Sequence, residues 1–240
     1  MIAYEPPLVE GRLVSRYQRF FADVELSGGR GTVTAHCPNP GSMKTCAEIG
    51  GRIWVQPKTG GGKLEWGWEL AEIGGRLISV NPTRSNALVA AAIEAGAIPE
   101  LAGYPKLRRE ATAGDSRLDF LLARGAKHRD RCFVEVKTVT MDGGALGLAA
   151  FPDSVTDRGV RHLDELRALR KQGYRAVLLF VVARSGSTRM RPADEIDPAY
   201  GVALRTAAAA GVELLAYAAI PSLGGLSFGA KLPIELAKPR

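Results

Sequence analysis

Two acidic residues and a lysine interrupt two apolar stretches in the middle of the chain. Asp119 lies within Ser116–Leu122 (SRLDFLL), and Glu135 and Lys137 lie within Cys132–Thr140 (CFVEVKTVT). In a β-strand, residues two apart point to the same side, so Glu135 and Lys137 are expected to share one face. If the two stretches form adjacent strands, all three charged side chains converge at one place on the sheet.

These residue types suit phosphodiester hydrolysis with a divalent cation. Two neighbouring carboxylates repel each other unless a cation lies between them. Asp119, Glu135 and the backbone carbonyl of Val136 would supply the few oxygen ligands that Mg²⁺ accepts while it keeps several waters. The metal would act as a Lewis acid and lower the pKa of a bound water. Lys137 could hold that water or neutralise charge in the transition state. The alternative is a surface ion pair between Glu135 and Lys137 on an edge strand, worth at most about 1 kcal/mol.

The second half of the chain has the pattern of a mixed sheet flanked by helices. The expected elements are a helix at 83–96, strands at about 106–111, 117–123 and 131–140, a helix at 155–173, a strand at 175–183, a helix near 198–210 and a strand at 212–220. Short connections between the first three strands favour antiparallel neighbours. The strand, helix and fully apolar strand that follow favour a parallel crossover.

The first 80 or so residues are predicted to be all-β. Phe20–Leu26 (FFADVEL) alternates apolar and acidic residues, and further short strands are separated by Gly-rich turns such as SGGRG and KTGGGK. This pattern favours a small closed or partly open barrel, with an OB-like Greek key as one candidate. We therefore expect two domains, at residues 1–82 and 83–240.

Composition narrows the class of protein. The 240 residues carry a net charge of +7, which is compatible with a polyanionic partner but does not require one. No signal-peptide pattern and no run of about 18 apolar residues is present, so we expect a soluble, cytoplasmic protein without a membrane partner. Cys37, Cys46 and Cys132 are odd in number and lack CxxC spacing, which argues against a disulfide framework. His36 beside Cys37 does not follow zinc-finger spacing.

Several long motifs in this arrangement resemble known families. SRLDF and VEVK, within the order helix, three strands, helix, strand, are similar to the PD-(D/E)xK restriction-endonuclease-like nucleases. More narrowly, HCPNPGSMK at 36–44, FPDSVTDRGVRHL at 151–163 and PADEIDP at 192–198 resemble the sugar fermentation stimulation protein (SfsA) family. The resemblance covers nearly the whole chain. It implies an OB-like nucleic-acid-binding domain, a restriction-endonuclease-like domain and DNA binding.

The resemblance also assigns residues. Asp119 takes the first acidic position, Glu135 the second and Lys137 the lysine position, while Leu118 stands where the motif's name has proline. Proline contributes no ligand, so this departure puts little in doubt. Related folds often carry an acid on the first helix, and Glu94 is the only acidic residue on the helix expected here. It is a further candidate metal ligand, with a solvated helix residue as the alternative.

Three further groups could contact nucleic acid. They are Arg158 and His162 on the helix at 155–173, His36, Asn39, Ser42 and Lys44 in the loop HCPNPGSMK, and Arg12, Arg16 and Arg19 beside aromatic residues in GRLVSRYQRFF. The first pair is spaced i,i+4 and could touch a phosphate, or could pair with an acid and fill the helix–sheet interface. The loop could cradle a phosphate, or be a turn between strands. The arginines suit a single-strand groove, although the aromatics could equally form barrel core.

The sequence therefore predicts an α/β (α+β) chain with an OB-like barrel followed by a restriction-endonuclease-like mixed sheet flanked by helices. Its expected function is cleavage of DNA or RNA with Mg²⁺ or Mn²⁺, without sequence specificity. The alternatives are a DNA-binding regulatory protein, which the family's name connects with sugar metabolism, and a hydrolase of small phosphate esters. The complete set of acidic and lysine positions favours catalysis. The oligomeric state is left open, a homodimer included.

Overall fold

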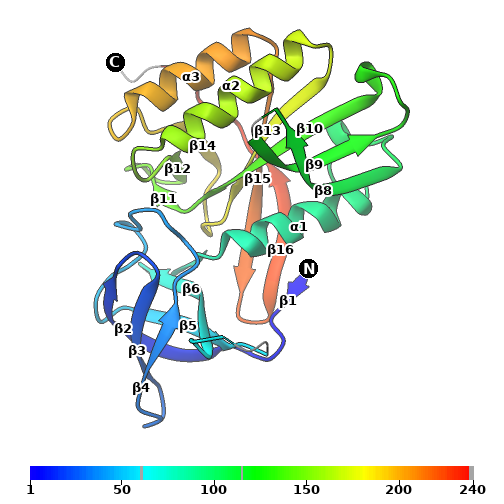
Figure 1. Cartoon of the computed structure of the whole chain (residues 1–240). Coiled ribbons are helices and arrows are strands. Elements are labelled where there is room, and N and C mark those ends of the chain that lie inside the picture. Colours follow the sequence, from blue (N-terminus) through cyan, green and yellow to red (C-terminus); the bar gives the residue numbers. More distant parts are fainter. Residues whose placement is uncertain (60–61, 115, 238–240) are drawn as a thin grey trace.

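The computed structural model describes residues 1–59, 62–114 and 116–237, except for the side chain of Ser116. A small β-barrel lies beside a larger sheet that carries helices on both faces (Figure 1). The expected mixed α and β class is confirmed. In the described part of the chain, no helix is both long enough and apolar enough to cross a membrane.

The barrel is one six-stranded sheet curled on itself. Its strands are β2 (Val9–Tyr17), β3 (Phe21–Leu26), β4 (Thr32–His36), β5 (Arg52–Pro57), β6 (Trp66–Ile73) and β7 (Arg76–Ser79). They are ordered β4-β3-β2-β5-β6-β7, and β4 also pairs with β6, which closes the barrel. Leu13, Val24, Val55 and Trp68 fill its interior with no exposed surface, as expected where side chains alternate inward and outward along strands. The OB-like barrel is therefore confirmed.

The second sheet has seven strands. It contains β1 (Ile2–Ala3), β16 (Gly225–Lys231), β15 (Glu213–Ser222), β13 (Arg175–Val182), β10 (Arg131–Val139), β9 (Ser116–Ala123) and β8 (Lys106–Ala113), in that order. β8, β9 and β10 are antiparallel neighbours, as their short connections predict. β13 is parallel to both β10 and β15, which confirms the crossover. The near-continuous apolar sequence of β13 follows from burial on both faces.

Helices cover the two faces of this sheet. α1 (Pro82–Glu94) lies on one face, and α2 (Asp157–Lys171) and α3 (Pro198–Ala209) lie together on the other (Figure 1). Each begins at a side-chain cap, because Asn81, Thr156 and Asp197 accept hydrogen bonds from backbone N–H groups of the first turn. Two short 3₁₀ helices, Pro99–Leu101 and His128–Asp130, lie in the connections.

Several elements were not predicted from the sequence. A small third sheet joins β11 (Met141–Asp142), β12 (Leu148–Phe151) and β14 (Arg189–Pro192), and β16 extends the large sheet. Ile2–Ala3 precede the barrel in the chain, yet they pair with β16 at the edge of the large sheet. The chain therefore passes from the large sheet to the barrel and back again.

One loop of the barrel is fastened to the large domain. The Met43 N–H donates to Asp153 Oδ2 at 2.9 Å, and the Ser42 hydroxyl donates to the Asp153 backbone carbonyl. Arg184, only 6% exposed, donates to the Thr45 carbonyl at 3.2 Å and pairs with Asp142 at 2.8 Å. This loop consequently has a fixed position over the end of the sheet.

Candidate active site

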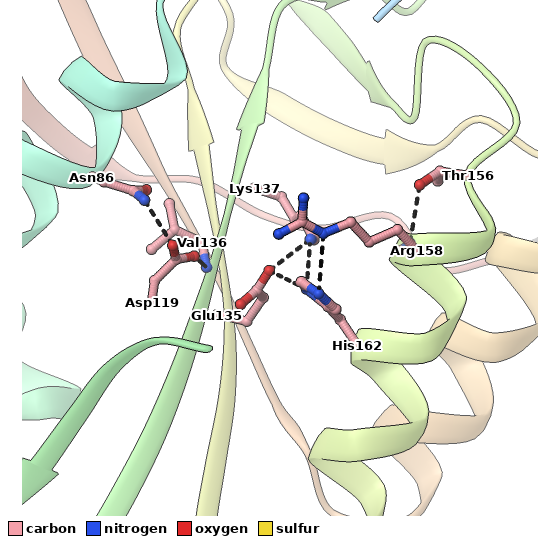
Figure 2. A network of polar contacts seen from close by, with 9 residues as sticks. Asn86, Asp119, Glu135, Val136, Lys137, Thr156, Arg158 and His162 are labelled. Atoms are coloured by element: carbon pink, nitrogen blue, oxygen red, sulfur yellow. Dashed lines mark hydrogen bonds and ion pairs between the residues drawn. The ribbon is translucent and has the colours of Figure 1, made fainter. Parts of the chain in front are cut away.

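Glu135 and Lys137 lie on the face of β10 that α2 covers. Glu135 is only 3% exposed, and Lys137 Nζ lies 2.7 Å from Glu135 Oε1. His162 of α2 contacts the same Glu135 oxygen through Nδ1, which is also 3.2 Å from Lys137 Nζ (Figure 2). The expectation that strand residues two apart share a face is confirmed here. Glu135 is buried, Lys137 is half-buried and β10 lies inside the sheet, so the alternative of an exposed edge-strand ion pair does not describe them.

Asp119 approaches from the neighbouring strand. Pairing between β9 and β10 ends at Phe120 and Val134, and beyond this pair the strands no longer share backbone hydrogen bonds. The Asp119 carboxylate replaces the lost partner by accepting a bond from the Val136 N–H at 2.8 Å. Its other oxygen accepts a 2.7 Å bond from the Asn86 side chain of α1 (Figure 2). These two hydrogen bonds, one to each oxygen, fix the orientation of the Asp119 carboxylate.

The two carboxyl groups differ in proton affinity. Burial, followed by the negative charge of Glu135, raises the pKa of Asp119 to about 6, although the Val136 N–H, Lys137 and Asn86 act in the opposite direction. Burial also acts to raise the pKa of Glu135, but the hydrogen bond from His162 and the charge of Lys137 outweigh it and the pKa is lowered. Glu135 is therefore the ionised partner, and Asp119 feels its charge. Repulsion of this kind is relieved when a cation binds between two carboxylates.

The site opens into a cavity of about 730 Å³ that is walled by both domains. Asp119, Glu135, Val136 and Lys137 lie in its lining. The barrel contributes Arg19 and residues 38–41, and the start of α2 contributes Arg158, Arg161 and His162. Because the deeply buried Glu135 faces this space, the cavity gives solvent and ligands access to the carboxylates.

The side chains fit a hard divalent cation. Glu135 Oε2 is buried and, among the described residues, has no hydrogen-bond partner. A buried carboxylate oxygen without a partner is costly unless it binds an ion. Within the described residues, no group of three or more His, Cys, Asp or Glu side chains is placed to hold a metal. The protein would thus offer Asp119, Glu135 and the Val136 carbonyl, with water and substrate completing the shell, as Mg²⁺ prefers.

Glu94 is not brought to this site. It is the last residue of α1, its side chain is exposed, and it does not contribute to the cavity lining. Asn86, about two helical turns earlier, is the α1 residue that faces Asp119. The sequence shows no signal for this, because a polar residue near a helix start also suits a solvated position.

Arg158 and His162 do contact each other, with Arg158 Nε 3.4 Å from His162 Nε2. His162 is 5% exposed and lies between α2 and the sheet, which is the interface position considered above. The network assigns a hydrogen to Nδ1, facing Glu135, and leaves Nε2 to accept from Arg158. Both ring nitrogens are therefore engaged within the protein, while Arg158 remains exposed at the cavity. Phosphate contact by this pair stays a prediction.

The loop at 36–44 uses most of its polar groups internally. Arg16 donates to the backbone carbonyls of Asn39, Gly41 and Ser42, and the Asn39 side chain accepts from the Gly41 N–H. Arg16 is therefore a structural clamp for the loop. The exposed Lys44 lies outside the cavity lining.

The remaining basic candidates are dispersed. His36 lines a second cavity of about 390 Å³, where burial and then Lys58 lower its pKa. Arg12 is exposed and donates to the Gly50 carbonyl at 2.8 Å. Arg19, by contrast, lines the main cavity. Among the three arginines of this segment, the structure brings only Arg19 to the carboxylates.

Comparison with known proteins gives a consistent result over the whole chain. The model of the SfsA N-terminal OB domain matches residues 14–80, and that of the sugar fermentation stimulation protein RE domain matches residues 83–224. Sugar fermentation stimulation protein homologs from Pseudomonas paraeruginosa (51% identity over 97% of this chain and 99% of the relative) and Thioalkalivibrio sulfidiphilus (46% identity over 98% of each) are similar. The structure of Pyrococcus furiosus SfsA in complex with Ca²⁺ superposes with a TM-score of 0.88, at 28% identity over 96% of both chains.

Proposed function

The chain belongs to the sugar fermentation stimulation protein (SfsA) family, and from its site we propose that it hydrolyses phosphodiester bonds of DNA, with RNA as a further substrate, using Mg²⁺ or Mn²⁺. The observation that carries this proposal is one cavity that holds a buried carboxylate with an unpartnered oxygen, a second carboxylate of raised pKa, and a lysine. Phosphate groups repel carboxylates, so a protein that only binds DNA gains nothing from them here.

Each residue has a defined task. Asp119, Glu135 and the Val136 carbonyl would hold the cation, which when bound supplies Lewis-acid activation and makes a bound water more acidic. Lys137 places its ammonium beside Glu135 and can donate to the attacking water or to a non-bridging phosphate oxygen. His162 donates to Glu135 from Nδ1 and so holds this carboxylate in place.

Exposed arginines would bind the substrate backbone. Arg19 lies on the barrel side of the cavity, and Arg158 and Arg161 lie on the α2 side. Contacts of this kind fix a nucleic acid through its phosphates and do not read bases. Binding should therefore be independent of sequence and weaken steeply with salt.

A relative supports the choice of cation. The solved Pyrococcus furiosus SfsA is described as a complex with Ca²⁺. Ca²⁺ and Mg²⁺ both take oxygen ligands, so a family member binds a cation of the class that the two carboxylates here would accept.

The test is a cleavage assay with end-labelled single- and double-stranded DNA and RNA in Mg²⁺, Mn²⁺ or chelator. We expect metal-dependent cleavage that falls at least about 100-fold in Asp119→Ala and in Lys137→Ala. Lys171→Ala is the matched control, because Lys171 at the end of α2 is exposed outside the cavity and its loss should leave the rate unchanged. Cleavage that survives both active-site substitutions would refute the site.

The non-catalytic alternative is favoured by one observation: the arginines at the cavity would bind DNA whether or not it is cut. If the protein retards DNA in a gel but cleaves none with either metal, the DNA-binding regulatory function replaces the nuclease.

A further inference from the structure

The cavity suits one strand of nucleic acid. Its volume of about 730 Å³ lies within the roughly 300–1,000 Å³ of pockets that enclose a single small ligand. Glu135 is only 3% exposed within it. A single strand presents its phosphates without a complementary strand beside it, so it can bring a phosphodiester down to this buried carboxylate.

The barrel wall of the cavity is held in a fixed position. Arg16 binds the backbone carbonyls of Asn39 and Gly41, and Met43 donates to the Asp153 carboxylate of the large domain. A Cβ on Gly41 would collide with that same carboxylate, so the wall and the large domain are in close contact. Moving this wall outward would break this set of hydrogen bonds, so its position relative to the large domain is fixed.

The β2–β3 turn, Gln18–Phe20, presents a cation and an aromatic ring beside this wall. Gln18 and Arg19 have φ values of 48° and 64°, a left-handed conformation that residues other than glycine rarely adopt. The turn is kept in this form because Arg16 donates to the Arg19 carbonyl and the Cys37 N–H donates to the Phe20 carbonyl. Arg19 lines the cavity, and the Phe20 ring, next to it, is 46% exposed.

We propose that the substrate is a single strand of DNA or RNA, guided into the cavity by this turn, with a base stacked on Phe20 and a phosphate bound by Arg19. The proposal rests on the proposed function and narrows its substrate class. An exposed aromatic ring beside an arginine is the arrangement that binds single strands without regard to sequence, because every base has a face that can stack. Arg158 and Arg161 of α2 also line the cavity, where they can bind the next phosphates of the strand.

Binding tests the proposal without cleavage. In chelator, the full-length protein is titrated into a fluorescein-labelled oligothymidylate and, separately, into a labelled duplex of the same length. We expect the single strand to bind more tightly, and Phe20→Ala to weaken this binding roughly 5- to 100-fold. Phe20→Trp, which keeps an aromatic ring, should bind the single strand as tightly as wild type. Arg19→Ala should lower the slope of the logarithm of the binding constant against the logarithm of the salt concentration by about one, the value for one lost phosphate contact. Ile49→Ala, which removes another exposed apolar side chain of the barrel, should have no effect.

A substrate without bases separates this proposal from the nuclease function. Hydrolysis of an abasic deoxyribose phosphate oligomer needs the metal site but offers no nucleobase. We expect Phe20→Ala to leave that rate unchanged while it slows cleavage of single strands, and Lys137→Ala to slow both. If no phosphodiester is hydrolysed but single-strand binding depends on Phe20, the nuclease function fails and the binding mode stands. If the duplex binds as tightly as the single strand, or Phe20→Ala binds normally, the guiding role is overturned.

Discussion

Replacing Asp119 by asparagine should stabilise the metal-free protein, although it removes a site residue. The change keeps the shape of the side chain and removes its charge. The asparagine side chain can still accept from the Val136 N–H, and its amide can donate to Asn86 once the Asn86 amide turns over, so both hydrogen bonds of Asp119 have a replacement. The substitution removes the cost of burying a charge, which is the larger effect, and the repulsion between Asp119 and Glu135.

The size of the effect follows from the pKa of Asp119, which rises from 3.8 to about 6 on folding, with burial as the largest cause and Glu135 next. At about 1.4 kcal/mol per pKa unit, this difference amounts to roughly 3 kcal/mol. The folded protein binds this proton more tightly than the unfolded chain. The penalty is therefore absent below about pH 4, grows as the pH rises through the folded-state pKa near 6, and is complete above it.

The assay is thermal unfolding of wild type and Asp119→Asn in chelator across this pH range. Near pH 7.5 the variant should unfold roughly 6–10 °C above wild type, and near pH 4 the two should coincide. Added Mn²⁺ or Mg²⁺ should raise the unfolding temperature of wild type, because a ligand that binds only the folded state stabilises it. The variant should gain much less.

Glu94→Gln is the matched control. It also removes one carboxylate, but Glu94 is exposed at the end of α1 outside the cavity, so neither stability nor the response to metal should change. If Asp119→Asn is no more stable than wild type at about pH 7.5, neither burial nor the neighbouring Glu135 makes the Asp119 charge costly in the folded protein. The argument that a cation shared by Asp119 and Glu135 relieves their repulsion would then be wrong.

Three other substitutions test the supports of the site. Gly41→Ala should lower the free energy of unfolding by about 1–3 kcal/mol in urea, because its methyl group meets the Asp153 carboxylate. Arg16→Lys should lower the free energy of unfolding by about 2 kcal/mol, because an ammonium cannot reach the several carbonyls that the guanidinium binds. A denaturation curve equal to that of wild type would contradict the role of Arg16 as a clamp. His162→Gln should weaken metal affinity roughly 10- to 100-fold in a metal titration, because it removes the hydrogen bond that orients Glu135. Unaltered affinity would show that His162 only fills space between α2 and the sheet.

The face shared by Glu135 and Lys137 could be predicted because it depends only on the period of a strand. The place of Asp119 on the adjacent strand followed from a short connection, and the helix expected at 155–173, observed as α2, followed from the spacing of its apolar residues. These are local rules. They extend over a few residues and do not depend on the rest of the fold.

The contacts between residues far apart in the sequence could not be predicted. Asn86 meets Asp119 across 33 positions, and Met43 meets Asp153 across 110. Such contacts depend on how α1 is rotated and how the barrel docks, which no periodicity in the chain records. Arg16 shows the same limit, since its type and neighbours suit nucleic-acid binding whereas its guanidinium is enclosed by backbone carbonyls.

The barrel is better understood as one wall of the site than as a separate binding unit joined by a linker. Its chain enters from β1, which is paired within the large sheet, and leaves through β7, where Ile78 bridges to Arg184. Arg184 in turn binds the Thr45 carbonyl of the barrel and Asp142 of the large domain. Attachment at both ends and in the middle fixes the orientation of the barrel. Because Arg19 and the loop at 38–41 line the cavity only in that orientation, the isolated large domain would retain its carboxylates but lose the barrel wall that we propose guides a single strand.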